Sequence, residues 1–237
     1  MITKAQQKLI RSLVQKKYRQ REGLFVAEGP KVVGDLVEAG VEQVMLFKEP
    51  EVTAEELRKV SFLQHPQGVL GIFKIPAIPQ PTMNKKKLML ALDGVQDPGN
   101  LGTIIRIADW FGINTLICSD DTADAWNPKV VQATMGSLAR VNIIYTSLPT
   151  LLDRLPDNYP IYGTFLDGKN IYTEQLTSGG LIIMGNEGNG ISEEVRQRVN
   201  RCLLIPDFHQ GETADSLNVA IATAITCSEF RRRPARG

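Results

Sequence analysis

The sequence contains few of the residues that build metal clusters or disulfide frameworks. It has two histidines, His65 and His209, and three cysteines in 237 residues. The cysteines, Cys118, Cys202 and Cys227, are odd in number, far apart and mostly inside apolar runs, which predicts reduced core thiols. With so few candidate ligands, we expect no metal site.

Long apolar runs are also missing. No stretch approaches the roughly 20 apolar residues of a membrane span, and no signal peptide opens the chain. We therefore expect a cytoplasmic protein without membrane segments. With 43% hydrophobic residues the chain can form one large core or two small ones.

The net charge of +1 hides an uneven distribution. Four arginines close the chain, and positions 22 to 230 hold 16 basic and 26 acidic residues, a formal charge of −10. Basic ends can simply improve solubility, but on an acidic body they also favour a polyanion partner such as RNA. The candidate RNA-binding residues are the seven basic residues that precede the first acid: Lys4, Lys8, Arg11, Lys16, Lys17, Arg19 and Arg21.

Residues 1–75 show the pattern of a small α/β module. Leu9, Ile10, Leu13 and Val14 form an apolar stripe on a predicted helix over residues 3–15. Further helices are expected from Pro30 and from the capping box at residues 53–56, and strands at 24–27, 44–47 and 70–75. Residues 76–87, with three prolines and a lysine run, are the predicted linker.

Residues 88–237 alternate predicted strands and helices, which favours a mostly parallel sheet. The expected strands span residues 88–92, 115–118, 141–145, 161–165, 181–184 and 202–205. The expected helices span 100–111, 128–135, 148–155 and the Ala-rich segment 219–230. The last two strands are each followed by a polar, Gly-containing loop, and loops at strand ends are where open α/β sheets bind ligands.

The loop 185–190 has three glycines in six positions. A tight turn explains an isolated glycine cluster, and a dinucleotide fingerprint is the sharper alternative. The spacing here is G-x-x-G-x-G, and the loop comes late in the chain, so the fingerprint is disfavoured. The second loop ends at Asp215 and Ser216, either of which is a natural N-cap for the helix that follows.

Three sequence motifs carry a family resemblance. The segment DPGNLGTIIRIAD (97–109), the segment MGNEGNGIS (184–192), and LLIP with SLNVAIATAI (203–206 and 216–225) resemble, in order, the three motifs of the SpoU (TrmH-like) RNA ribose methyltransferases of the SPOUT class. FVAEGPKVV and HPQGVLGI resemble the substrate-binding domain that often precedes them. The resemblance implies an L30e-like α/β domain, followed by a SPOUT domain with a C-terminal trefoil knot.

The family implies a chemistry: S-adenosylmethionine donates a methyl group, without metal, to a ribose 2′-OH of rRNA or tRNA. Arg106 matches the family's catalytic arginine. A charge in an apolar helical run is costly without a partner, so a structural ion pair is the alternative role. A guanidinium is a poor base. We therefore expect Arg106 to hold the target phosphate or ribose and to acidify the hydroxyl.

The remaining site residues also follow from the motifs. Asn100, Glu187, Ser216 and Asn218 are the further candidates for the catalytic site, with helix capping or plain exposure as the alternatives. The residues implied in cofactor binding are Gly185, Asn186, Gly190, Ile205, Leu217 and Asn218. The loop 207–215 is about three residues longer than the family's compact form.

The resemblance also implies a homodimer, with the helix 219–230 a candidate for the interface. A non-catalytic RNA-binding protein on the same scaffold is the main alternative function, and a nucleotide-dependent oxidoreductase is the third. Arg106, Glu187 and Asn218 are all present, which favours an enzyme.

Overall fold

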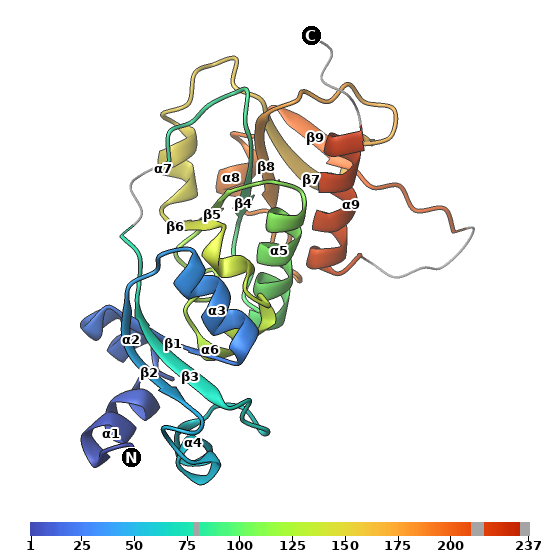
Figure 1. Ribbon diagram of the computed structural model, residues 1–237. Helices are drawn as coiled ribbons and strands as arrows, with labels where there is room; N and C mark the ends of the chain where they lie inside the picture. Colours follow the sequence, from blue (N-terminus) through green and yellow to red (C-terminus); the bar gives the residue numbers. More distant parts are fainter. Residues whose placement is uncertain (78–80, 210–215, 233–237) are drawn as a thin grey trace. The chain divides into compact units, whose positions relative to one another are not determined.

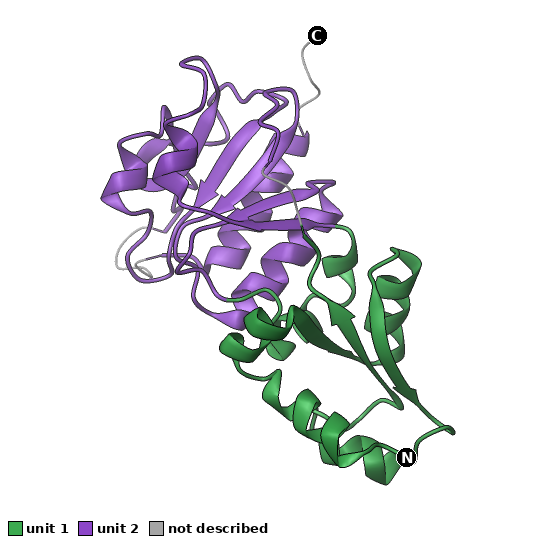
Figure 2. Ribbon diagram, turned by 90° about the vertical axis from the view of Figure 1, so that its left-hand side faces the viewer, with its two compact units in different colours: residues 1–77, 124–140 green, residues 78–123, 141–237 purple. Residues whose placement is uncertain are grey.

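The computed structural model describes residues 1–77, 81–209 and 216–232, and it divides into two compact units (Figure 2). Unit 1 comprises residues 1–77 and 124–140, and unit 2 comprises residues 78–123 and 141–237. The expected domain boundaries at residues 75 and 88 stay a prediction. The grouping adds a feature that the sequence did not indicate, because a segment from the middle of the chain belongs to unit 1.

Unit 1 contains a three-stranded antiparallel sheet in the order β1-β3-β2 (Figure 1). Its elements are α1 (Lys4–Ser12), α2 (Lys16–Glu22), β1 (Leu24–Glu28), α3 (Pro30–Glu38), β2 (Gln43–Lys48), α4 (Ala54–Val60), β3 (Val69–Lys74), α6 (Pro128–Ala133) and the 3-10 helix η1 (Ser137–Ala139). The predicted small α/β module is confirmed.

Local sequence signals explain where the helices of unit 1 begin. Thr3 and Thr53 each form a capping box, with Gln6 and Glu56 respectively. The apolar stripe of α1 buries Ile10 and Leu13, but Val14 is 48% exposed. Since α1 ends at Ser12 with Leu13 as its C-cap, the stripe stops at Leu13 and Val14 lies beyond the cap.

Arg19 corrects one prediction. Its side chain is buried, and its guanidinium donates to the carbonyls of Leu13 and Val14 and to Asp124 Oδ2, the last at 2.5 Å. The expectation that Arg19 binds RNA is wrong, because all of these bonds are internal. Arg19 instead fixes the turn between α1 and α2 and joins it to the segment 124–140.

Unit 2 is built on a six-stranded sheet in the order β6-β5-β4-β8-β7-β9. All of its strand pairs are parallel, which confirms the predicted sheet. Its elements are β4 (Leu88–Leu92), α5 (Pro98–Trp110), β5 (Thr115–Cys118), β6 (Asn142–Tyr145), α7 (Leu148–Leu152), β7 (Ile161–Asn170), β8 (Gly180–Met184), α8 (Glu193–Arg196), β9 (Arg201–Leu204) and α9 (Val219–Arg232).

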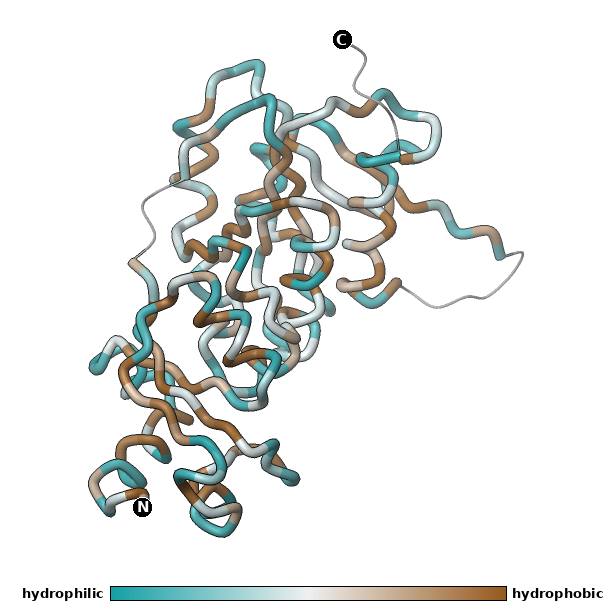
Figure 3. Tube along the Cα trace, in the orientation of Figure 1, coloured by the Kyte–Doolittle hydropathy of each residue, from teal (hydrophilic) through white to brown (hydrophobic). Residues whose placement is uncertain are grey.

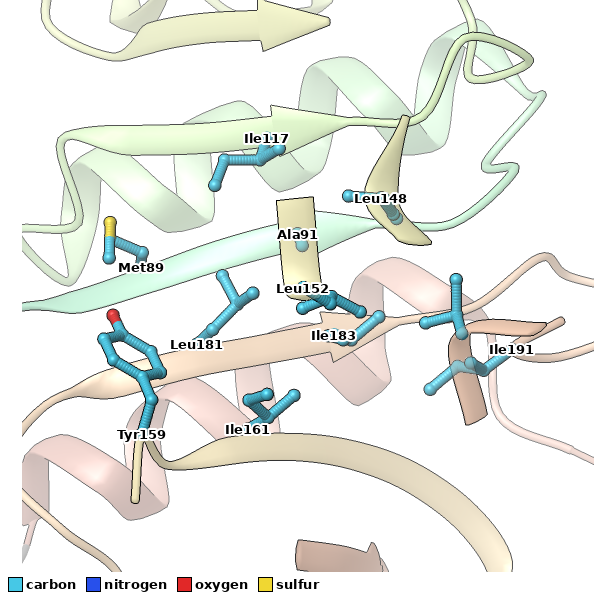
Figure 4. Packing of buried hydrophobic residues seen from close by; sticks show 11 residues of the cluster. Met89, Ala91, Ile117, Leu148, Leu152, Tyr159, Ile161, Leu181, Ile183 and Ile191 are labelled. Atoms are coloured by element: carbon cyan, nitrogen blue, oxygen red, sulfur yellow. The ribbon is translucent and has the colours of Figure 1, made fainter. Parts of the chain in front are cut away.

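The central strands β4 and β8 are buried at every position. The tube in Figure 3 is mostly brown, the colour of hydrophobic residues, along these two strands. Such continuous burial is typical of a parallel sheet with helices on both faces. On one face, α7 and α8 pack over a cluster that includes Leu152, Ile183 and Val195. Figure 4 shows this cluster, with α5 and α9 behind the sheet on the other face.

Helices α5 and α9 run parallel and are joined at both ends. At the N-terminal ends, Asn218 Nδ2 donates to Asn100 Oδ1 at 3.0 Å. At the C-terminal ends, the Arg231 guanidinium donates to the carbonyls of Phe111 and Gly112. These bonds align both helix N-termini with the carboxyl ends of the strands, where the predicted motifs lie.

The predicted thiols are free, and Cys118 and Cys227 are buried. Burial raises the pKa of the Cys227 thiol to about 12, which keeps it protonated and unreactive. No helix in the described ranges is long and apolar enough to cross a membrane. The cytoplasmic location and the trefoil knot both stay predictions.

Tyr159 gives a stability prediction. Its hydroxyl is buried, has no hydrogen-bond partner among the described residues, and is directed towards Met89 (Figure 4). Burial raises its pKa to about 12. Because an unsatisfied buried hydroxyl costs about 1–3 kcal/mol, Tyr159→Phe should leave the free energy of unfolding in urea unchanged or higher.

Tyr159→Ala is the matched control, since it also removes the ring and should destabilise by about 3–5 kcal/mol. A loss above about 1 kcal/mol for Tyr159→Phe would mean that the hydroxyl has a partner.

Candidate functional site

A cleft of about 690 Å³ opens in unit 2 at the carboxyl ends of β8 and β9, beside the middle of β7. Its walls come from three segments that are distant in sequence: residues 164–167, residues 184–196 and residues 204–222 in part. The described lining combines a glycine-rich loop, which exposes backbone, with apolar side chains such as Met184 and Leu217. A cleft of this size and composition fits a small-molecule ligand.

The glycine loop after β8 is closed by its own backbone. Asn186 and Gly190 exchange two backbone hydrogen bonds, at 2.8 and 3.0 Å. Gly185 lies so close to this closure that a Cβ would stand 2.2 Å from the Gly190 carbonyl carbon. Gly190 has φ +68°, a conformation that favours glycine. The glycines therefore let the loop fold back beside the cleft.

The Asn186 side chain holds this loop to the loop after β4. Its Oδ1 accepts from the N–H groups of Gly188 and Asn189, and its Nδ2 donates to the Gly94 carbonyl at 2.6 Å. A second bond ends the loop, from the Ser192 N–H to the buried carboxylate of Asp93 at 2.7 Å. The side chain and the backbone of Asn186 are thus both used to fix the loop beside the cleft.

A chain of side-chain hydrogen bonds joins the three sequence motifs. Asn218 Nδ2 donates to Asn100 Oδ1, and Asn100 Nδ2 donates to Glu187 Oε1, each at 3.0 Å. Asn100 and Asn218 are 118 residues apart in sequence. The fold thus brings together three of the five predicted catalytic residues.

The directions of these bonds follow from the start of α9. Asn218 Oδ1 accepts from the N–H groups of Ala220 and Ile221, so its amide NH₂ is left to face Asn100. Asn100 must then present its oxygen to Asn218 and its NH₂ to Glu187. Glu187 is therefore the acceptor at the end of this chain, and its carboxylate oxygen receives the hydrogen bond from Asn100.

Asn218 also corrects the predicted helix cap. Asp215 or Ser216 was expected at this position, but α9 begins at Val219 and Asn218 bonds its first N–H groups. Asp215 lies outside the described residues. Ser216 is exposed and lines the cleft, together with Ile205 and Leu217. At α5 the cap is Asp97, which leaves the Asn100 side chain free for Glu187.

Arg106 stands apart from the cleft. It lies on α5 two turns after Asn100, is exposed, and is not part of the described cleft lining. Its side chain makes no hydrogen bond or ion pair with any residue that the structure describes. The alternative role of a structural ion pair therefore finds no partner in these ranges, and the side chain faces solvent although its neighbours in the helical run are apolar.

Four residues near the cleft escaped the sequence prediction. Asp93 holds the glycine loop, while Phe165, Asp167 and Arg196 form one side of the cleft. No motif identified them, since their positions depend on how β7 and α8 meet. In the parts of the chain that the structure describes, no three His, Cys, Asp or Glu side chains are grouped to hold a metal ion.

Comparison with known proteins identifies the family that has this arrangement. Residues 87–228 match the profile of the SpoU rRNA Methylase family, and residues 4–56 match the MRM3-like substrate binding domain. The chain belongs to the SpoU rRNA methylase family. It is 31% identical over 233 residues to the 23S rRNA (guanosine(2553)-2′-O)-methyltransferase RlmP of Bacillus subtilis, across 91% of this chain and 92% of that protein.

Two solved structures share the SpoU fold over nearly the whole chain. One, from Porphyromonas gingivalis, is described as an RNA methyltransferase of the TrmH family. It is 40% identical with a TM-score of 0.88, covering 98% of this chain and 99% of that one. The other is the S-adenosylmethionine-bound rRNA methyltransferase of Sinorhizobium meliloti, 31% identical with a TM-score of 0.83, covering 98% and 96%.

The size and the lining of the cleft in this SpoU domain suit S-adenosylmethionine. Backbone N–H and C=O groups of the glycine loop can bind an adenosine without side chains, and apolar residues such as Met184 and Leu217 can pack on its base. Gly185, Asn186, Gly190, Ile205 and Leu217 would hold the ligand from both sides.

Gly185 provides a test of this binding site. A Cβ at this position meets backbone within 2.2 Å, so Gly185→Val should displace the loop closure and abolish S-adenosylmethionine binding in titration calorimetry.

The matched control is Gly188→Ala in the same loop. Its Cβ would find only an ordinary contact, 3.6 Å from Asn186 Oδ1, so binding should persist. Unchanged binding in Gly185→Val would place the ligand elsewhere.

Proposed function

We propose that this protein is an S-adenosylmethionine-dependent RNA methyltransferase that acts on a ribose 2′-OH. The observation that carries the proposal is the Asn218–Asn100–Glu187 chain beside a backbone-lined cleft, in a chain of the SpoU family. We take a structured rRNA as the substrate. In support, RlmP is named a 23S rRNA methyltransferase, and residues 4–56 match a substrate-binding domain.

The chemistry requires an activated hydroxyl. The cofactor supplies a methyl group on a sulfonium, so the C–S electron pair returns to sulfur as the 2′-O–C bond forms and the hydroxyl loses its proton. The N-terminal ends of α5 and α9 both lie at the site, but Asp97 and Asn218 cap them, so the helix dipoles contribute little to stabilising the developing oxyanion. Glu187, held as an acceptor, can orient the hydroxyl or receive its proton.

Arg106 is the cation that this mechanism needs at the RNA. Its unpaired guanidinium can bind the target phosphate or ribose bidentately and lower the pKa of the 2′-OH. Its exposure suits that role, because a group that must meet RNA cannot be committed inside the protein. Binding of S-adenosylmethionine does not require it, since it lies outside the cleft lining.

Arg106→Ala should therefore lower methyl transfer by about a hundredfold or more, the scale of losing a positioned catalytic group. Cofactor binding should stay nearly intact, and a substrate RNA with a single 2′-deoxy at the target should be inert. Transfer is measured with radiolabelled cofactor under single-turnover conditions.

Arg154→Ala is the control, since Arg154 is another exposed arginine of unit 2 away from the cleft. A transfer rate near wild type for Arg106→Ala would remove Arg106 from the mechanism. Cofactor binding without transfer to any RNA would favour the non-catalytic RNA-binding alternative.

We propose that the RNA-binding surface lies on α1 and α2. Six of the seven predicted residues remain candidates: Lys4, Lys8, Arg11, Lys16, Lys17 and Arg21 are all exposed. The four lysines make no ion pair within the described ranges, whereas Arg11 caps a carbonyl of α4 and Arg21 pairs with Glu22. Cations without an anionic partner in the protein are the ones available to phosphates.

Replacing Lys16 and Lys17 with Gln should weaken RNA binding and flatten its salt dependence. Each lost phosphate contact reduces the log–log slope by roughly 0.7 to 0.9. Fluorescence anisotropy at several salt concentrations measures the slope. Point substitutions are preferable to deleting the N-terminal residues, because deletion would strip segment 124–140 of its partners in unit 1.

The control is Lys48→Gln with Lys74→Gln, which makes the same charge change in the same unit. Both of these lysines are paired, with Glu51 and Glu42. An equal slope change in the two double variants would mean that net charge, and not the α2 surface, sets the affinity.

We further propose a homodimer that uses the exposed side of α5 and α9. Trp110 is 85% exposed and Ile221 is 53% exposed, although both are large and apolar. Such side chains on packed helices favour burial against a second copy.

Light scattering should accordingly give twice the monomer mass of 26.2 kDa at micromolar concentration. Trp110→Lys should shift the protein towards monomer, because burying a charge in an apolar interface is unfavourable. Val37→Lys, at an exposed apolar position of unit 1, should leave the mass unchanged. A monomeric wild type would contradict the proposal.

A further inference from the structure

The cleft contains a single cation among its described lining residues, Arg196. Its guanidinium lies over the Phe165 ring, 4.4 Å from the ring centre, and donates to Asp167 Oδ2 at 2.7 Å. Its side chain is 37% exposed, so it is partly removed from water. Phe165 and Asp167 line the cleft as well, so the cation is held in place by two neighbours at the cleft wall.

The sheet order shows which side of the cleft this is. Neighbouring strands run β4-β8-β7-β9. Asn100 follows β4 and Glu187 follows β8, whereas Phe165 and Asp167 belong to β7. The Arg196–Asp167 pair therefore lies on the β7 side of the cleft, and the Asn218–Asn100–Glu187 chain lies on the β4 side.

The ligand's charges can be compared with this pair, which makes the inference dependent on the proposed function. The adenosine half of S-adenosylmethionine is uncharged, and backbone groups suffice to bind it. The methionine half ends in an α-carboxylate and an α-ammonium. A carboxylate is best bound by a guanidinium, and an ammonium needs acceptor oxygens.

The β7 side supplies both kinds of group. Arg196 is the cation, and Asp167 and Glu193 are the carboxylates of the described lining on this side. The hydrogen bond from Arg196 lowers the pKa of Asp167 and so favours its carboxylate form. The Arg196–Phe165 stack also orients the guanidinium before any ligand arrives, which reduces the entropic cost of binding.

We propose that Arg196, held by Phe165 and Asp167, is the anchor for the α-carboxylate of the cofactor's methionine half, and that Asp167 and Glu193 provide acceptors for its α-ammonium. The glycine loop holds the adenosine half. Arg196 is then a cofactor-binding residue that belongs to none of the three sequence motifs.

The test separates the two halves of the ligand. Titration calorimetry of Arg196→Gln uses three probes: S-adenosylmethionine, S-adenosylhomocysteine and 5′-methylthioadenosine, which lacks the amino acid group. The first two should bind about 10- to 100-fold more weakly, the scale of losing a charge-assisted hydrogen bond. Binding of 5′-methylthioadenosine should not change.

Two further variants control for the fold. Arg198→Gln removes an arginine two residues away that pairs with Asp153 outside the cleft, and it should bind all three probes normally. Arg196→Lys keeps the charge and should recover part of the lost affinity. Thermal unfolding of each variant shows whether its fold is intact.

Three results would overturn the proposal. Equal weakening of all three probes would assign Arg196 to the adenosine half or to the cleft wall, and unchanged binding of all three would remove it from the site. Arg196→Lys binding as weakly as Arg196→Gln would exclude a charge-based anchor. A wild-type protein that binds none of the probes would instead contradict the proposed function itself.

Discussion

The hydrogen bonds from Asn218 to Asn100 and from Asn100 to Glu187 are the interaction on which the rest of the site depends. They exist only because β4 and β8 are adjacent and because α9 returns beside α5. The helix cap at Asn218 fixes the direction of every bond in the chain. The start of α9 and the geometry of the site are therefore coupled, because the cap bonds that Asn218 makes to the first turn of α9 also orient its side chain towards Asn100.

The loops around the cleft are arranged before any ligand binds. Asn186 and Asp93 hold the glycine loop to the end of β4, so the loop is already fixed at the cleft that it lines. A site built from backbone needs such anchors, because no side chain can adjust its position afterwards. This preorganisation is what lets a protein use small polar residues where a stronger ligand group is absent.

The charged residues divide into two kinds with different roles. Arg19 and Arg231 are committed to internal carbonyls or to Asp124 and act as structural parts. Lys16, Lys17 and Arg106 have no anionic partner among the described residues, and they remain available for phosphate. A count of basic residues cannot make this distinction, because it depends on which carbonyls and carboxylates the fold brings near each side chain.

The sequence alone determined the two modules, the parallel sheet and the residues of the three motifs, because strands, caps and glycine turns are encoded over a few neighbouring positions. It missed α2, whose KKYRQRE segment has no apolar stripe, and the short α8. It also misplaced the cap of α9, since Ser216 and Asn218 are equally good caps until the start of the helix is known. Only the tertiary structure decided that segment 124–140 belongs to unit 1, that Arg19 is buried and that Arg196 faces the cleft. Each of these depends on contacts between residues far apart in the chain, and local patterns do not report long-range contacts.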